Sequence, residues 1–345
     1  MVSGVADRVR RARQVLPLFV VTSLFAGGCS SDTTEPAASS SPQFAPEPLS
    51  VVADGFDGPT QIADGPTGIL LVAQLAGDEG SATGEVVALD VATGARRVLL
   101  RALDKPTGVL WHDGVLWVME RRALVRASWP GTGGEIGPRE VVLGDLPFNG
   151  RSEGTLTLLA DGRFLYETSG TLDAGRPAEG SGTLWIFDPA TRTSSPLATG
   201  AKNAYAHAVL DDGRILTTEI GDNVTDAPVE ELDIVTLEGA PTDLGWPDCP
   251  GDQSCDGVVR PVALFPEAST PTGVAIVGND AYVSLFVTGE VVRIPIGDRA
   301  VGDEPASPTL VTDGLEGPHT LLARADGTVW ISEHLTGRIL ELPVG

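Results

Sequence analysis

Short runs of alternating hydrophobic and polar residues recur along the chain, and most are joined in pairs by an Asp-Gly turn. In "GVLWHDGVLWVME", for example, Asp113 and Gly114 separate two such runs. Hydrophobic runs on either side of a two-residue Asp-Gly turn are the strongest short-range signal for a β-hairpin. The pattern therefore predicts antiparallel strands, and no helical periodicity follows the N-terminal segment 1–28.

The hairpins belong to a repeat of about 47 residues. Successive copies are separated by 47, 48, 52, 65 and 47 residues. The residues that mark the six copies are Pro59, Pro106, Gly154, Ala206, Pro271 and Pro318. A third strand follows in several copies, as in "GEVVALDVATG" and "GTLWIFDPATRT". Repeats of this length with four strands are typical of propeller blades. Residues 49–345 are therefore predicted to form an all-β, six-bladed β-propeller of four-stranded antiparallel blades.

The last copy reaches the C-terminus without a clear outer strand. An open ring would leave unpaired sheet edges, which folded proteins avoid. The hydrophobic run "LSVVADGF", residues 49–56, is well placed to supply the missing strand. We therefore expect the N-terminal end of the propeller to complete its last blade.

The first 28 residues have the features of an export signal. Four arginines between Arg8 and Arg13 precede the hydrophobic run "VLPLFVVTSLFAGG", which is short for a membrane span. The small residues directly before Cys29 resemble a bacterial lipoprotein cleavage site, which implies a lipid on Cys29 and a membrane anchor. The alternative is ordinary secretory cleavage that leaves a spare cysteine. The Ser/Pro-rich segment 29–48 reads as a disordered tether.

The chain carries 23 Lys and Arg against 47 Asp and Glu, a formal net charge of −24. Such a surface repels nucleic acid and anionic lipid headgroups, so neither is an expected partner. Membrane contact is expected through the lipid alone. The acidity is explained either by solubility or by binding of a divalent cation, which needs clustered oxygens.

The other two cysteines, Cys249 and Cys255, lie in "CPGDQSC". A close pair in an exported chain favours a disulfide. A thiol metal site is the alternative, but no third soft ligand lies nearby. The pair falls in the one long step of the repeat, which holds roughly 18 extra residues and includes "EELDIVTLEGAPTDLGWPDC", residues 230–249. Propeller function is usually found in such loops.

Residues 202–249 resemble the glucose/sorbosone dehydrogenase family in the order and spacing of their motifs. The resemblance rests on Lys202-Asn203, "TEIGD", "EELD" and Gly-Trp-Pro followed by cysteine. Members of that family are exported six-bladed propellers that oxidise aldoses with pyrroloquinoline quinone and calcium. The resemblance is specific over about 50 residues and architectural over the rest.

Four residues are expected at a quinone or another anionic ligand: Arg151, Lys202, Asn203 and His319. The resemblance places Asn203 against the quinone, and Lys202 stands where the family has arginine. Arg151 stands where the family has its catalytic histidine. A guanidinium cannot accept a proton near neutral pH, so Arg151 cannot be the base, and the catalytic residue is left unknown. Salt bridges from Arg151 and Lys202 to Glu219 or Glu231 are the alternative.

Calcium is the second cofactor that the resemblance implies. Backbone carbonyls at Gly221 and Asp222 correspond to the family's calcium ligands, and Glu230 and Glu231 correspond to its acidic motif. We expect these acids to lie in one irregular loop over the mouth of blade four, with Trp246 packed beneath it and the disulfide supporting it. A solvated loop without metal is the alternative.

Of the four histidines, His112 is expected at the surface and His334 at a strand end, whereas His207 and His319 lie near the axial mouth. Three functions stay open at this point. The first is a quinone-dependent sugar dehydrogenase in which another residue replaces the base. The second is a non-catalytic, membrane-anchored propeller that binds a sugar, an anion or a protein. The third is a calcium-dependent lactonase-like hydrolase with axial carboxylates.

Overall fold

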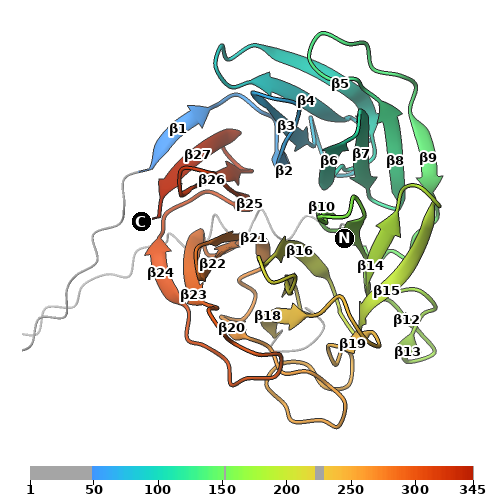
Figure 1. Ribbon diagram of the computed structural model, residues 1–345, viewed down its shortest axis with the longest axis vertical. Helices are drawn as coiled ribbons and strands as arrows, with labels where there is room; N and C mark the ends of the chain where they lie inside the picture. The colour runs from blue at the N-terminus through green and yellow to red at the C-terminus, as the bar shows by residue number, and fades with distance from the viewer. Residues whose placement is uncertain (1–48, 151–152, 222–228, 345) are drawn as a thin grey trace, which may run out of the picture. The chain divides into compact units, whose positions relative to one another are not determined.

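The computed structural model describes residues 49–150, 153–221 and 229–344, all within the unit Pro46–Gly345. Six small sheets surround a central axis, with β2, β6, β10, β16, β21 and β25 innermost (Figure 1). Every regular element of the described residues is a strand. The predicted six-bladed, all-β propeller is confirmed.

The blades follow one another in chain order, and each sheet pairs neighbouring strands. Blade one contains β2 (Pro59–Asp64), β3 (Ile69–Gln74), β4 (Gly84–Asp90) and β5 (Arg96–Leu103). Blade two contains β6 (Gly108–His112), β7 (Val115–Glu120), β8 (Ala123–Ser128) and β9 (Glu140–Leu143). Blade three contains β10 (Thr157–Leu158), β11 (Phe164–Thr168), β14 (Thr183–Asp188) and β15 (Thr193–Thr199), with a side hairpin of β12 (Leu172–Asp173) and β13 (Arg176–Pro177).

The second half of the ring repeats this arrangement. Blade four contains β16 (Ala204–Val209), β17 (Ile215–Glu219), β18 (Glu230–Val235) and β20 (Ala263–Phe265). Blade five contains β21 (Pro271–Val277), β22 (Asp280–Leu285), β23 (Glu290–Pro295) and β24 (Thr309–Thr312). Blade six contains β25 (Pro318–Ala323), β26 (Thr328–Glu333), β27 (Arg338–Pro343) and β1 (Ser50–Ala53).

The Asp-Gly turn of blade two has the geometry that the sequence predicts, whereas at Asp161, Asp212 and Asp326 only the following glycine has positive φ. Asp113 and Gly114 both have positive φ, 48° and 74°, and His112 pairs with Val115 across the turn. Positive φ at both central residues defines the type I′ turn, whose twist matches that of the flanking strands. The turn therefore fixes the register between β6 and β7.

The N-terminal strand completes the ring as predicted. β1 pairs antiparallel with β27, and Ser50 lies opposite Glu341. Leu49 and Val344 pack against the same hydrophobic cluster. The two ends of the folded chain therefore close blade six together.

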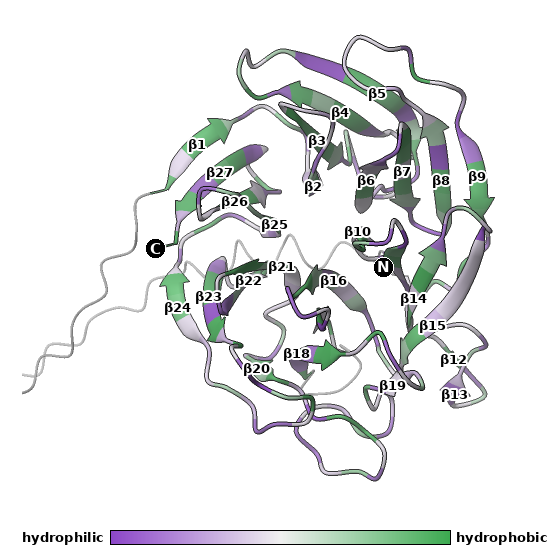
Figure 2. Ribbon diagram, in the orientation of Figure 1, coloured by the Kyte–Doolittle hydropathy of each residue, from purple (hydrophilic) through white to green (hydrophobic). Residues whose placement is uncertain are grey.

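Hydrophobic side chains fill the spaces between neighbouring sheets. Between blades two and three, the Trp117 ring lies 5.1 Å from Phe164 and 5.5 Å from Phe187, centroid to centroid. Figure 2 shows the sheets coloured mainly as hydrophobic, with hydrophilic segments on β5, β8 and β23. The core is thus a ring of wedges, each shared by two blades.

Threonine hydroxyls join the inner strands of neighbouring blades around the axis. Each donates to a backbone carbonyl of the next blade, at 2.8–3.3 Å. The bonds run from Thr60 to Pro106, from Thr107 to Gly154, from Thr272 to Pro318 and from Thr320 back to Thr60. Gln61 adds a bridge, because its amide bonds Val109 N and Leu156 O of the next two blades. The axis is therefore filled by a polar network.

The insertion in the long step is partly strand, and the expectation of one irregular loop over residues 230–249 is wrong. Its first six residues form β18, the third strand of blade four. The chain then crosses to blade three, where β19 (Thr242–Asp243) pairs in parallel with β15. Trp246 N donates to Gly200 O at 2.7 Å. The Gly-Trp-Pro corner is therefore anchored on blade three.

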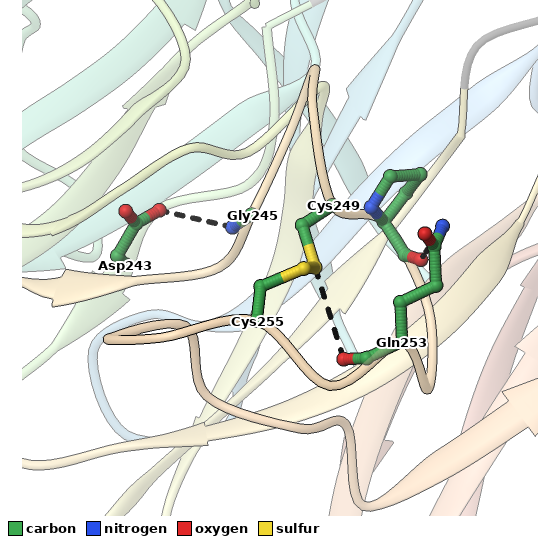
Figure 3. The surroundings of a disulfide bond; sticks show 6 residues. Asp243, Gly245, Cys249, Gln253 and Cys255 are labelled. Atoms are coloured by element: carbon green, nitrogen blue, oxygen red, sulfur yellow. Dashed lines mark hydrogen bonds between the residues drawn. A yellow bond between two sulfur atoms is a disulfide. The ribbon is translucent and has the colours of Figure 1, made fainter.

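The predicted disulfide between Cys249 and Cys255 is present, with Cα atoms 6.5 Å apart. Figure 3 shows it beside the corner, where Gly245 N donates to the Asp243 carboxylate at 3.0 Å. Cys249 N also donates to Gly245 O at 2.7 Å. The disulfide loop and the Gly-Trp-Pro corner are therefore hydrogen-bonded into one compact unit beside blade four.

Within the three described segments, no helix is long and apolar enough to cross a membrane.

Candidate functional site

The inner strands of all six blades begin at one end of the axis, which we call the mouth. The hairpin turns between first and second strands lie at the other end, which we call the hairpin face. An inner strand of six residues such as β2 spans about 20 Å, so the two faces are well separated. Three of the predicted ligand-binding residues, Lys202, Asn203 and His319, lie where an inner strand begins.

The structure holds Lys202 and Asn203 in place with protein partners. Lys202 Nζ donates to Gly170 O at 3.0 Å and lies 5.0 Å above the Trp246 ring. Asn203 is buried, and its Nδ2 donates to Glu167 Oε1. The Trp246 ring lies close to Gly170 and Gly182, where a Cβ atom would come within 2.9 and 3.3 Å of it. Trp246 therefore packs against blade three and helps to position Lys202. The prediction that it lies beneath a blade-four loop is wrong.

His319 belongs to an aromatic cluster at the mouth, together with Tyr205, Phe286 and His334. Tyr205 Oη and His319 Nε2 are 3.2 Å apart, and the two histidine rings are 5.6 Å apart. His319 Nδ1 is buried and has no hydrogen-bond partner among the described residues. Burial, reinforced by His334 and Lys105, holds the pKa of His319 well below its usual value. The imidazole is therefore neutral near pH 7.

His334 follows β26, as predicted for a strand end, but it is half-buried in this cluster rather than solvated. Its Nδ1 lies 3.1 Å from Pro59 O. Lys105 and Glu79 form an ion pair at 3.2 Å nearby, and the charge of each acts on His334. The mouth thus offers neutral ring nitrogens, a phenol, an aromatic wall and one cation-carboxylate pair.

His207, the other histidine near the axis, has a structural role. Its Nε2 lies 2.7 Å from Ala204 O, and burial lowers its pKa to about 4. The ring borders an axial cavity of about 30 Å³ that Gln61, Thr155 and Thr320 also line. His207 is therefore a neutral part of the polar network that fills the axis.

A carboxyl or amide group recurs at the end of the second strand in five of the six blades. In each case its oxygen accepts a backbone N–H from the segment that leads into the blade's own inner strand. The residues are Gln74, Glu120, Glu167, Glu219 and Glu333. In these five blades the side-chain oxygen thus fixes the position of the segment that enters the inner strand at the mouth.

Blades two and six balance this carboxylate with an arginine. Glu120 pairs with Arg139 at 3.0 Å, and Arg338 Nη2 pairs with Glu333 at 2.5 Å. A buried carboxylate usually needs such a partner, because removing a charge from water costs several kcal/mol. In these two blades an arginine neutralises the charge of the repeated carboxylate.

Blade three places a second acid beside the repeated one. Glu153 and Glu167 are fully buried and bonded crosswise: Ser169 N donates to Glu153 Oε2 at 2.9 Å, and Gly154 N donates to Glu167. Glu153 Oε1 and Glu167 Oε2 have no hydrogen-bond partner among the described residues. Burial raises the pKa of Glu153 to about 8, and burial together with Glu153 raises the pKa of Glu167 well above its usual value.

Blade four continues the row of acids on two paired strands. Glu219 lies opposite Glu231 in the ladder between β17 and β18, and Thr217 lies opposite Asp233. Burial is the main cause that raises the pKa of all three carboxyls, with repulsion among them adding to it. Each has one oxygen without a hydrogen-bond partner among the described residues. No described lysine or arginine forms an ion pair with these three acids or with Glu153 or Glu167, although the charges of Lys202 and Arg122 favour the ionised forms of Glu219 and Glu153.

These positions correct part of the predicted calcium site. Glu230 and Glu231 are strand residues with exposed fractions of 0% and 2%, not members of a solvated loop. Gly221 is buried against the Val229 backbone, which leaves no room for a Cβ atom, and the calcium role of its carbonyl stays a prediction. Arg151 and Asp222 lie outside the described residues. Among the residues that are described, no three His, Cys, Asp or Glu side chains meet in a metal-binding arrangement.

Sequence reasoning missed Glu153, Glu167 and the mouth residues Tyr205 and His334. A signal for Glu167 was present, because a glutamate stands five or six residues after the hairpin glycine in four copies of the repeat. Aligning the copies on that glycine would have shown the repeated acid. The extra acid Glu153 has no counterpart in the other copies.

No protein-family model and no curated protein matches the sequence. Solved structures do match. The PQQ-bound aldose sugar dehydrogenase of Streptomyces coelicolor is 21% identical, with a TM-score of 0.71 over 87% of this chain and 100% of that one. The calcium structure of a Trichoderma reesei carbohydrate-active enzyme of family AA12 is 16% identical, with a TM-score of 0.68 over 86% and 95%.

A putative gluconolactonase is a more distant match, 14% identical with a TM-score of 0.51 over 89% of this chain and 93% of that one. At these identities the comparisons establish the fold. The chain shares the six-bladed propeller fold of sugar dehydrogenases, as its motifs predicted. Its chemistry depends on the residues at the mouth.

Proposed function

We propose that the chain is an exported, lipid-anchored propeller of the sugar-dehydrogenase type that binds calcium in blade four and a sugar at the mouth. The observation that carries the proposal is the buried row of carboxyls in blades three and four, which forms no ion pair with a described lysine or arginine. The same structural position carries an arginine partner in blades two and six. The absence of such an ion pair among the described residues of two adjacent blades favours a role in binding over a role in folding.

Calcium would account for the buried acids of blade four, although the described residues alone do not form a complete metal site. It prefers several carboxylate and carbonyl oxygens. Glu219, Glu231 and Asp233 each present a buried oxygen without a partner in the described segments. Bound calcium would supply the positive charge that keeps these acids ionised inside the fold. The sequence resemblance also assigns calcium ligands at Gly221 and Asp222, of which Asp222 lies outside the described residues.

A sugar fits the aromatic cluster at the mouth. Sugars are neutral and offer many hydroxyl groups, which need both donors and acceptors on a rigid polar surface. The ion pair of Lys105 with Glu79 supplies both kinds at the surface, whereas His319 Nδ1 and Tyr205 Oη are buried behind it. The Phe286 ring, 5.8 Å from His319, supplies an apolar wall.

The described residues do not fit the quinone. A quinone that carries carboxylates needs cations that face the mouth. Lys202 instead donates to Gly170 O, and Asn203 donates to Glu167. The two mouth histidines are neutral because their pKa values are lowered. Quinone-dependent oxidation is therefore the second candidate, favoured by the motifs of residues 202–249.

A lactonase of the axial-metal type is less well supported. That chemistry requires carboxylates on the axis, whereas the described inner strands present threonines whose hydroxyls already bond backbone carbonyls. Gln61 and His207 occupy the centre. We therefore retain sugar binding as the proposed function.

The test measures thermal melts of the purified chain with calcium or with chelator. A hundredfold excess of calcium over its Kd should stabilise the fold by about 2.7 kcal/mol, or about 5 °C for a domain of this size. Glu231→Gln should remove most of this shift. The matched variant Glu333→Gln, at the repeated position in blade six, should keep it. An unchanged melting temperature in wild type would refute calcium binding.

A second assay addresses the mouth. Aldoses are titrated against wild type and His319→Ala, and the proposal requires saturable binding that the variant weakens at least tenfold. In parallel, the protein is mixed with pyrroloquinoline quinone, calcium and a redox dye. Aldose-dependent dye reduction would overturn our preference and establish the dehydrogenase.

A further inference from the structure

A groove of about 590 Å³ lies on the hairpin face, at the opposite end of the inner strands from the mouth. It spans the turn of blade one and the neighbouring edges of blades six and two. Its main lining residues are Asp64, Pro66, Ile69, Trp111, Arg324 and Trp330. The volume falls within the range of about 300–1,000 Å³ that is typical of small-ligand sites.

The groove is held in shape by specific contacts. Trp111 is fixed from behind, because its Nε1 donates to Trp129 O at 3.0 Å. The Arg324 guanidinium lies 4.4 Å above the Trp330 ring and donates to Asp64 at 2.6 Å. Backbone bonds between Gly65 and Ile69, at 2.9 Å, and between Ile69 and Pro66, at 2.8 Å, brace the turn that forms the floor. The surface is therefore preorganised, which lowers the entropy cost of binding.

The chemistry of this surface selects a neutral ligand. Arg324 and Asp64 neutralise each other, so the groove has no net charge that would attract an ion. The Asp64 carboxylate is still 62% exposed and the Arg324 side chain 26% exposed. A guanidinium has five N–H donors and a carboxylate about four acceptor sites, so both groups keep capacity for a ligand. The Trp111 ring, with Ile69 and Pro66, supplies an apolar platform.

A surface that combines an aromatic platform with a fixed donor-acceptor pair matches a sugar ring, which has an apolar face and a rim of hydroxyl groups. An anionic ligand is disfavoured by the net charge of −24. We propose that the groove is a binding site for a neutral oligosaccharide, separate from the mouth. Because the two sites lie on opposite faces, a glycan chain held in the groove leaves the mouth open.

The experiment titrates the folded protein with maltohexaose, cellohexaose, xylohexaose and chitohexaose, by tryptophan fluorescence and by calorimetry. We expect at least one hexaose to bind saturably. Trp111→Ala and Arg324→Gln should each weaken that binding at least tenfold. The matched control is Arg163→Gln, because Arg163 forms the same kind of pair with Asp161, at 2.6 Å, in the hairpin of blade three. The control should bind as wild type does.

Melting curves of each variant establish that the fold is retained, and Arg324→Gln, at a partly exposed position, keeps the test valid if Trp111→Ala unfolds. The mouth variant His319→Ala separates the two sites, since hexaose binding in the groove should survive it. The proposal is overturned if no hexaose binds, or if the groove variants bind as tightly as wild type. Loss of binding in His319→Ala alone would assign the oligosaccharide to the mouth instead.

Discussion

Replacing Glu153 by glutamine should stabilise the fold at pH 7.5 in a buffer that contains a chelator. The wild-type carboxyl has a pKa of about 8 in the folded chain, against 4.5 for the ordinary group. An acid whose pKa is raised by folding loses stability as pH rises from the lower value to the higher one. At pH 7.5 that loss is about 4 kcal/mol, at 1.36 kcal/mol per pH unit.

Glutamine keeps the acceptor for Ser169 N but brings a buried NH₂ group, which costs about 1–2 kcal/mol if it is imperfectly bonded. The neighbouring Glu167 Oε2 has no partner among the described residues and can accept from it. The expected net gain at pH 7.5 is therefore about 2–3 kcal/mol. This corresponds to about 5 °C in melting temperature for a domain of this size.

The assay is a series of urea or thermal melts between pH 5 and pH 9, with Glu333→Gln as the matched control. At pH 5 the penalty on wild type falls to about 0.8 kcal/mol, so the advantage of Glu153→Gln should vanish. Glu333→Gln leaves Arg338 without its buried partner and should destabilise the fold by about 3 kcal/mol. Equal destabilisation of both variants at every pH would refute the reasoning, because it would mean that Glu153 is compensated.

Three further outcomes are expected. Cys29→Ser should move the protein from the membrane fraction to the soluble fraction, as fractionation and blotting would show; a variant still bound to membrane would exclude a lipid on Cys29. Replacing Cys249 and Cys255 by serine should cost about 2–3 kcal/mol in a urea melt, from the loop entropy of the reduced chain, and no change on reduction of wild type would contradict this. Gly154→Ala should destabilise severely, because its Cβ would lie 2.2 Å from Tyr205 O, and it should express mainly as insoluble protein.

Residue patterns predicted the architecture because each hairpin carries its own turn signal. Asp113 and Gly114 fix one register locally, and the same local signal recurs in most other blades. The strand β18 was mistaken for loop because glutamate and aspartate are poor strand formers and are rarely buried. Its acids are buried only because the insertion and blade three cover them. That covering depends on contacts such as Trp246 against Gly170, which are far apart in sequence.

The candidate site was predictable only in part. The family-like motif brought attention to Lys202 and Asn203, yet their partners Gly170 and Glu167 come from blade three and carry no motif. A repeat alignment reveals a glutamate in four copies, but not which copies keep an arginine. Arg139 follows Glu120 by 19 residues, with β8 between them, so the pairing becomes visible only in the fold.

The pairing of β1 with β27 also sets an order of assembly. Ser50 and Glu341 lie opposite each other although nearly the whole propeller separates them in sequence. Contacts between such distant residues form slowly, because a long loop must close first. The first five blades do not need the N-terminal strand and can form as the chain emerges, with β19 joining blade three later, while blade six keeps an open edge until its last strand is made. A chain truncated before Arg338 would lack β27 and would therefore keep five complete blades. The edges of β1 and β26 would be left unpaired, and such edges can pair with another copy of the chain.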